Sequence, residues 1–422
     1  MPDVAGFLGV CFGKVVTANS PATRKENPGS WESVLWHEFC HVITLQKTSN
    51  RMPRWLSEGI SVFEERRTDS RWGQHMTPDF RDRILAGDVT PVADLSSAFL
   101  TAKSGEDLNF AYYESSMLVE HLVTVHGLPA LNAVLKDLND GVQINDALDR
   151  HTDGLDILEE SFAKFLNEQA TAFATGVEFA TEELAAAKLV DLVSVKAFLK
   201  DHPQNFSAII LYASLLIKAD QLHEAQSQLK KLITLVPQDD HTNGPRRLLS
   251  DIYKQREQTE LEMQTLTEHL QYSADDLEAA MRLQELCELL KQPERVVELG
   301  ATIFAIDPFQ PSALTRTVTA AESLGQTDVA ISALTSLLTL QKDDAARLHF
   351  RIAALLKETD KESARRHVLL ALAHAPRYRE AHKLLLKLVK EAAPQQSNAE
   401  AVKPSALDPP ASREMPTTEP QN

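Results

Sequence analysis

The chain has 422 residues, of which 43% are hydrophobic and 24% charged, values typical of a folded globular protein with two or three domains. Its formal net charge of −17 argues against sequence-independent nucleic-acid binding and against binding to anionic membranes, since both depend on lysine and arginine. The longest apolar run, residues 208–217, is shorter than the roughly 20 residues of a membrane-spanning helix, so we expect a soluble chain without a membrane span.

The N-terminal segment predicts a short strand. Residues 13–20 (GKVVTANS) have the pattern of a strand that precedes a helix. The residues before them have neither a basic start nor a long apolar core, so no signal peptide is expected in the sequence as written.

The sharpest motif is HEFCH at residues 37–41, an HExxH pattern. Ser30 is a suitable N-cap for a helix over about residues 31–46. At about 100° per residue, His37 and His41 lie within roughly 40° of each other on that helix. Two neutral imidazoles so placed can bind one Zn²⁺, and Glu38 beside them suits a general base acting on metal-activated water. An apolar stripe is expected on the opposite side, at Leu35, Phe39, Val42 and Ile43.

A catalytic zinc needs a third protein ligand and one open position. The segment PRWLSEGI at residues 53–60 offers Glu58, far enough from His41 for a helix end, a loop and a returning antiparallel helix. Gly59 would let those two helices approach closely, since it has no side chain. Glu65 fits a solvated acid better than a group behind a metal ligand, and Cys40 fits a small buried hydrophobe.

HExxH followed by a W-L-x-E-G-[IFL]-[SA] segment resembles the gluzincin metallopeptidases, which include aminopeptidase-N-like and thermolysin-like enzymes. The resemblance covers about residues 8–170 and is closest to the bacterial peptidase MA-like domains, which are often fused to tetratricopeptide (TPR) repeats. It implies that zinc is bound by His37, His41 and Glu58, with Glu38 as the catalytic base.

The resemblance also implies a role for a tyrosine before the apolar helix at residues 117–125. In similar enzymes a tyrosine at the start of such a helix stabilises the oxyanion of the tetrahedral intermediate. Tyr112 matches that place better than Tyr113, although a packed aromatic side chain explains the residue equally well. The strand at residues 13–20 corresponds to the edge strand that pairs with substrate in gluzincins, and an ordinary edge strand is an equal alternative.

The sequence departs from the family in one respect. Gluzincin domains usually carry several strands before the active-site helix, whereas only about 30 residues precede it here, enough for one or two. Either the domain is reduced or the natural start lies upstream of Met1. The second alternative leaves a periplasmic or secreted location open.

Residues 200–391 repeat with a period of 34. Pro203 and Pro237 are 34 residues apart, and Pro308 and Pro376 are twice that distance apart. Small or short side chains recur at a fixed place in the units, namely Ala225, Val296, Ala330 and Ala364. This stretch resembles TPR repeats, with about five units and a final helix to about residue 391, and a generic helical bundle is the alternative.

The expected protein is therefore mostly α. A small α+β gluzincin-like metallopeptidase domain at residues 1–170 is followed by a helical linker at 171–199, a TPR-like α-solenoid at 200–391 and a disordered tail at 392–422. We expect zinc-dependent hydrolysis of peptide bonds, with the solenoid recruiting a protein partner or substrate. Two alternatives stay open: a TPR scaffold with a degenerate, non-catalytic peptidase domain that keeps zinc, and a scaffold without metal.

Overall fold

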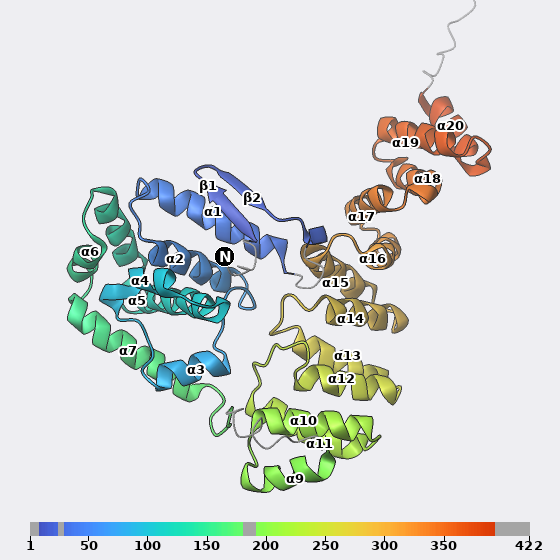
Figure 1. Cartoon of the computed structure of the whole chain (residues 1–422). Coiled ribbons are helices and arrows are strands. Elements are labelled where there is room, and N and C mark those ends of the chain that lie inside the picture. The colour runs from blue at the N-terminus through green and yellow to red at the C-terminus, as the bar shows by residue number, and fades with distance from the viewer. Residues whose placement is uncertain (1–7, 24–28, 180–190, 393–422) are drawn as a thin grey trace, which may run out of the picture. The chain divides into compact units, whose positions relative to one another are not determined.

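The computed structural model describes residues 8–23, 29–179 and 191–392 (Figure 1). Part of the predicted linker, residues 180–190, and the predicted tail from residue 393 onward lie outside the described residues. The chain divides into two compact units, Met1–Lys342 and Asp343–Asn422, which are treated separately below. The fold is mostly α, with a single two-stranded sheet among the described residues.

The sheet consists of β1 (Gly9–Phe12) and β2 (Val15–Ala18), which pair antiparallel with Gly9 opposite Ala18 and Phe12 opposite Val15. Gly13, at φ 64°, forms the reversal between them, in a region of backbone conformation that favours glycine. Both strands pack on the helix α1 (Trp31–Lys47). The predicted strand at residues 13–20 is thus the second arm of a hairpin.

Helix α1 begins where predicted, because the Ser30 hydroxyl accepts a hydrogen bond from the Ser33 backbone N–H. Its apolar stripe, however, is not the buried face. Leu35 is 38% exposed, and Phe39 and Ile43 are each 50% exposed, whereas the buried positions are Val34, Glu38, Cys40, His41 and Thr44. Helix α1 turns its histidine face, not its apolar face, towards the next helix, and two short strands cover little of the other side.

The core of this part of the chain surrounds α5 (Gly105–Asn139). Around it lie α2 (Arg54–Thr68), α3 (Pro78–Leu85), the 3₁₀ turn η2 (Val92–Asp94), α4 (Leu95–Thr101), α6 (Ile144–His151) and α7 (Leu155–Ala172). A further short 3₁₀ turn, η1 (Pro21–Thr23), precedes α1. Helix α5 is long and apolar enough to cross a membrane, by length and composition only. It is interrupted at Gly127 (φ 79°), and its apolar residues, such as Leu118 and Val119, are fully buried in the core, as in the central helix of a globular domain.

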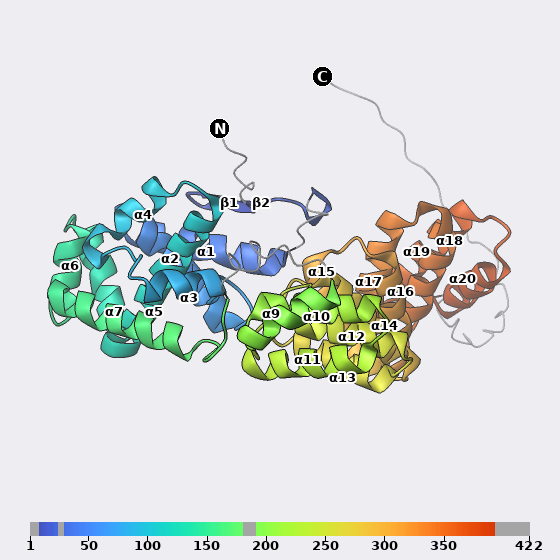
Figure 2. The same ribbon diagram turned by 60° about the horizontal axis from the view of Figure 1, so that its bottom comes forward.

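The solenoid begins after α9 (Leu192–Asp201). Within the first unit it consists of four helix pairs: α10 (Phe206–Lys218) with α11 (Leu222–Leu235), α12 (Pro245–Gln255) with α13 (Thr259–His269), α14 (Leu277–Leu289) with α15 (Pro293–Ile306), and α16 (Pro311–Ser323) with α17 (Thr327–Leu340). Figures 1 and 2 show the partners of each pair lying side by side.

Small or short side chains recur at the same position in successive helix pairs. Ala225, Val296 and Ala330 lie in the second helix of their pairs and are 0–3% exposed, so a short side chain is what allows the two helices to touch. Pro237 and Pro308 come just after the ends of α11 and α15. The second pair starts with Pro245 in the first turn of α12, a position that needs no backbone N–H.

The second unit starts in the 3₁₀ turn η3 (Lys342–Asp344) and contains α18 (Ala345–Leu356), α19 (Lys361–His374) and α20 (Arg379–Ala392). Ala364 is fully buried in α19, at the same place in the repeat as Ala330. Its neighbours in this small core include Ala353, Val368 and Leu388. The described solenoid residues thus form five helix pairs and a final helix.

Candidate metal centre

The short connection between α1 and α2 brings the two halves of the motif together. Helix α1 ends at Lys47, and Ser49 and Asn50 adopt positive φ values of 51° and 58° that reverse the chain. Pro53 caps α2, which begins at Arg54. The face of α2 that carries Glu58 therefore packs against the histidine face of α1.

The side chains of His37, His41 and Glu58 converge. The Glu58 Oε2 atom lies 3.2 Å from Nε2 of His37 and 3.2 Å from Nε2 of His41. All three ligand atoms lie within 4.8 Å of one another, and the imidazole rings meet nearly at right angles, at 84°. Two imidazole nitrogens and one carboxylate oxygen are the donor set of a catalytic zinc site with one position left open.

Side chains of α2 lie within hydrogen-bond distance of Nδ1 of each imidazole, the nitrogen that faces away from the centre. The Oε1 atom of Glu65 lies 2.5 Å from Nδ1 of His37, and Glu65 is only 6% exposed. The expectation of a solvated acid was therefore wrong: two helical turns after Glu58, the helix brings this carboxylate back to the same face. An outer carboxylate of this kind fixes the orientation of a metal-binding imidazole and makes it a stronger ligand.

Two serines do the same for His41. Ser57 Oγ lies 2.9 Å and Ser61 Oγ 3.3 Å from Nδ1 of His41. The Ser61 hydroxyl also donates to the backbone carbonyl of His37, at 3.2 Å, so its oxygen is left to accept from Nδ1–H of His41. With Nδ1 donating in this way, Nε2 of His41 can present its lone pair to a metal.

The electrostatics of the cluster call for a cation. Burial alone lowers the pKa of His37, but hydrogen bonds to Glu58 and Glu65 outweigh it and raise the pKa to about 10. Burial raises the pKa of Glu58, and its hydrogen bonds to His37 and His41 outweigh that and hold the pKa well below its ordinary value. The buried carboxylates thus favour a positive charge between them, and a divalent cation would supply that charge. The residues present fit zinc.

Glu38 lies beside this cluster and is not one of its donors. It is 6% exposed, and burial raises the pKa of its carboxyl above the ordinary range, although His37 and His41 lower it. Strand β1 covers it: a Cβ atom on Gly9 would lie 2.7 Å from Cγ of Glu38 and 2.8 Å from its Oε1. Only glycine at that position leaves room for the carboxylate.

The two neighbouring tyrosines point to different places. Tyr112 lies near His37, with ring centroids 6.4 Å apart, and Arg54 Nη2 lies 3.4 Å from its hydroxyl. Tyr113 is buried on the other side, where its hydroxyl lies 3.9 Å from Sδ of Met76. The structure therefore brings Tyr112 to the candidate centre and places Tyr113 away from it.

Sequence reasoning missed Ser57, Ser61 and Arg54. The spacing could have found the serines, because Ser57 and Ser61 are one helical turn apart on the face that carries Glu58. Arg54 is less regular: it contacts Glu58 at 3.3 Å and lies over the ring of Phe99, with 44% of its side chain exposed.

The role of Gly59 also differs from the prediction. A Cβ atom there would lie 2.6 Å from the backbone oxygen of Ser115, which belongs to α5 and not to α1. Glycine thus allows α2 to approach the central helix, and that contact sets the position of Glu58.

A family model described as Peptidase MA superfamily matches residues 25–168, which include α1, α2 and the whole candidate centre. This part of the chain is a Peptidase MA domain. The described helix pairs that follow form a TPR-like α-solenoid, so the chain is a Peptidase MA domain fused to TPR-like repeats. No curated protein matches the chain at a significant level.

Several solved TPR structures are similar to part of the chain. YrrB, described as a TPR protein with an unusual peptide-binding site, is 15% identical, with a TM-score of 0.33 over 46% of this chain and 97% of that one. A MamA fragment from Desulfovibrio magneticus is 12% identical, with a TM-score of 0.28 over 44% and 96%. A thermophilic TPR protein from Thermus thermophilus is 16% identical, with a TM-score of 0.20 over 47% and 89%. These scores are low, so the assignment depends on the helix pairs themselves.

Proposed function

We propose that the Peptidase MA domain is a zinc-dependent metallopeptidase. One observation carries the proposal: His37, His41 and Glu58 offer three convergent ligand atoms for a metal. Beside them lies a buried carboxylate, Glu38, that is not one of the ligands. Zinc, when bound, supplies a Lewis acid for the scissile carbonyl. Fixed imidazoles and a separate carboxylate are what such a hydrolysis needs from the protein.

Each residue then has its own part. Glu65, Ser57 and Ser61 hold the two imidazoles so that their Nε2 atoms face the centre. Glu38 takes a proton from the attacking water as the new carbon–oxygen bond forms, and passes it to the leaving amine when the carbon–nitrogen bond breaks. Its burial and raised pKa suit it to that exchange.

Tyr112 is proposed as the donor to the developing oxyanion. Its hydroxyl is held by Arg54, and its pKa is raised by burial and by the nearby Glu58 carboxylate, so it stays protonated at neutral pH. A neutral hydroxyl beside the reacting carbonyl donates a hydrogen bond that strengthens as negative charge builds up on the oxygen.

The solenoid is proposed to recruit a protein substrate or partner. Stacked helix pairs of this type expose a long surface that suits binding to a polypeptide. If it recruits substrate, a cleaved protein should show a lower KM than a short peptide with the same scissile sequence. Equal KM values for the two would contradict recruitment.

The catalytic proposal is tested with Glu38→Gln in the full-length chain. On a library of internally quenched peptides, we expect kcat to fall by roughly 10²–10⁴-fold, the usual contribution of a general base, while zinc content stays unchanged. Glu32→Gln is the matched control, since Glu32 lies in the first turn of the same helix and is exposed. Cleavage by Glu38→Gln at the wild-type rate would contradict the mechanism.

A further inference from the structure

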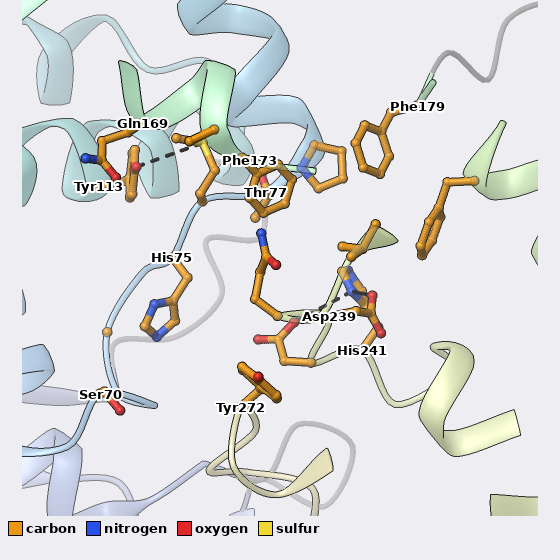
Figure 3. A pocket seen from close by; sticks show the side chains of 18 of the residues that line it. Ser70, His75, Thr77, Tyr113, Gln169, Phe173, Phe179, Asp239, His241 and Tyr272 are labelled. Carbon is orange, nitrogen blue, oxygen red and sulfur yellow. Dashed lines mark hydrogen bonds and ion pairs between the residues drawn. The ribbon is translucent and has the colours of Figure 1, made fainter. Parts of the chain in front are cut away.

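A cavity separate from the metal centre lies within the first unit (Figure 3). It encloses about 610 Å³, which is within the range of small-molecule sites. Its walls come from the loop between α2 and α3, the end of α7 with the segment after it, and the loops between α11 and α12 and between α13 and α14. Single residues of α5 and α10 complete the lining. Figure 3 shows Phe173 and Phe179 at one end and His75, Asp239 and Tyr272 at the other.

The lining combines aromatic rings with acids. Five rings contribute, from Tyr113, Phe173, Phe179, Phe206 and Tyr272. Asp239 and Asp240 supply two carboxylates, and the described residues that line the cavity include neither lysine nor arginine. Aromatic faces and carboxylates together attract an organic cation, whereas they offer little to an anion.

Two buried acceptor atoms at the cavity have no hydrogen-bond partner among the described residues. Burial lowers the pKa of His75, so its ring is neutral, and its N–H is directed to the backbone of Arg71 and Trp72. Its Nε2 is therefore left as an acceptor, buried and without a hydrogen-bond partner among the described residues. The Oδ2 atom of Asp239 is likewise buried and unpartnered, and that side chain is only 3% exposed. Unpartnered buried acceptors of this kind call for a donor.

No positively charged side chain nearby donates a hydrogen bond to either of these two atoms. His241 contacts Oδ1 of Asp239 at 3.0 Å and Oδ1 of Asp240 at 3.6 Å, so a single imidazole faces two carboxylates. Arg246 is outside the lining and lies over the ring of Tyr272, at 4.8 Å from the centroid. Asp240 keeps half of its side chain exposed, at 48%, and can contact a ligand directly.

We propose that this cavity binds an organic cation with several N–H donors, a guanidinium or primary ammonium group. The carboxylate of Asp240 would pair with its charge, Nε2 of His75 would accept one of its N–H bonds, and the aromatic rings would enclose its alkyl part. The cation has two possible sources, a free small molecule or the side chain of a bound peptide.

The test is a binding measurement by calorimetry on the full-length Glu38→Gln chain, in which ligands stay intact. Nα-acetyl-arginine amide is compared with Nα-acetyl-citrulline amide, which has the same shape and no charge. The arginine compound should bind at least about tenfold more tightly. Asp240→Asn should remove that preference, and Asp343→Asn, which removes an exposed charge outside the cavity, should not.

The outcomes separate clearly. Equal binding of the two compounds, no binding of either, or the same effect of Asp240→Asn and Asp343→Asn would overturn the proposal. An acetylated pentapeptide amide with a central arginine distinguishes the sources: binding at least about tenfold tighter than the single residue assigns the cavity to peptide side chains, and equal binding assigns it to a free cation. Because binding is the readout, failure here leaves the catalytic proposal untouched.

Discussion

Replacing Glu65 by glutamine tests whether the groups behind the imidazoles control the metal centre. In the structure Glu65 is buried and lies 2.5 Å from Nδ1 of His37, so the carboxylate orients that ring and increases its electron density. The amide keeps the size and one acceptor but loses the charge. Loss of such an outer carboxylate typically weakens metal binding about 10–100-fold, or about 1.4–2.8 kcal/mol.

The assay is competition for zinc against a chromogenic chelator near neutral pH, with the unfolding transition measured in parallel. Glu64→Gln is the control, because Glu64 is the preceding residue and pairs with Arg67 near the surface. The reasoning predicts weaker zinc binding for Glu65→Gln only. It would be refuted if the two variants bound zinc equally well, within about twofold of the unchanged chain.

Three further predictions concern the same domain. Gly59→Ala should unfold at a lower denaturant concentration than the unchanged chain. A methyl group 2.6 Å from the Ser115 carbonyl oxygen costs about 1–3 kcal/mol or more, whereas the gain in helix propensity is about 1 kcal/mol. Unchanged or higher stability would contradict this prediction. Tyr112→Phe should lower kcat about 10²-fold with little change in zinc content, whereas equal kcat would remove its proposed role. Glu114 is buried, and desolvation raises its pKa from 4.5 to about 7, so its favourable contribution is complete below about pH 4.5 and is lost as the pH rises towards 7. Glu114→Gln should therefore gain about 3 kcal/mol relative to the unchanged chain between about pH 4 and pH 8, and a pH-independent difference in denaturant unfolding would contradict it.

Much of this architecture could be predicted from local spacing. Two histidines four residues apart must share a helix face, and the distance to Glu58 allows one helix reversal. The resemblance to gluzincins then points to Glu58 as the third donor. The 34-residue period and the small residues at Ala225 and Ala330 likewise define a stacked helix pair whose interface excludes larger side chains.

Features that depend on tertiary packing could not be predicted in this way. Glu65 is buried only because α2 turns its whole Glu58 face towards α1, and a second acid two helical turns after Glu58 does not by itself specify that direction. The exposure of Leu35, Phe39 and Ile43 depends on how much sheet covers α1, and helix periodicity predicts an apolar face without predicting what covers it. Gly59 similarly indicates a close approach, but only the fold shows that α5 is the partner.

The most direct test of the central claim is the zinc content of the purified chain, measured by elemental analysis after dialysis against a weak chelator. The account predicts about one zinc per chain, reduced to near zero in Glu58→Ala and in His41→Ala and retained in Glu64→Gln. A chain without zinc, or equal zinc in all of these variants, would contradict the proposed metal centre.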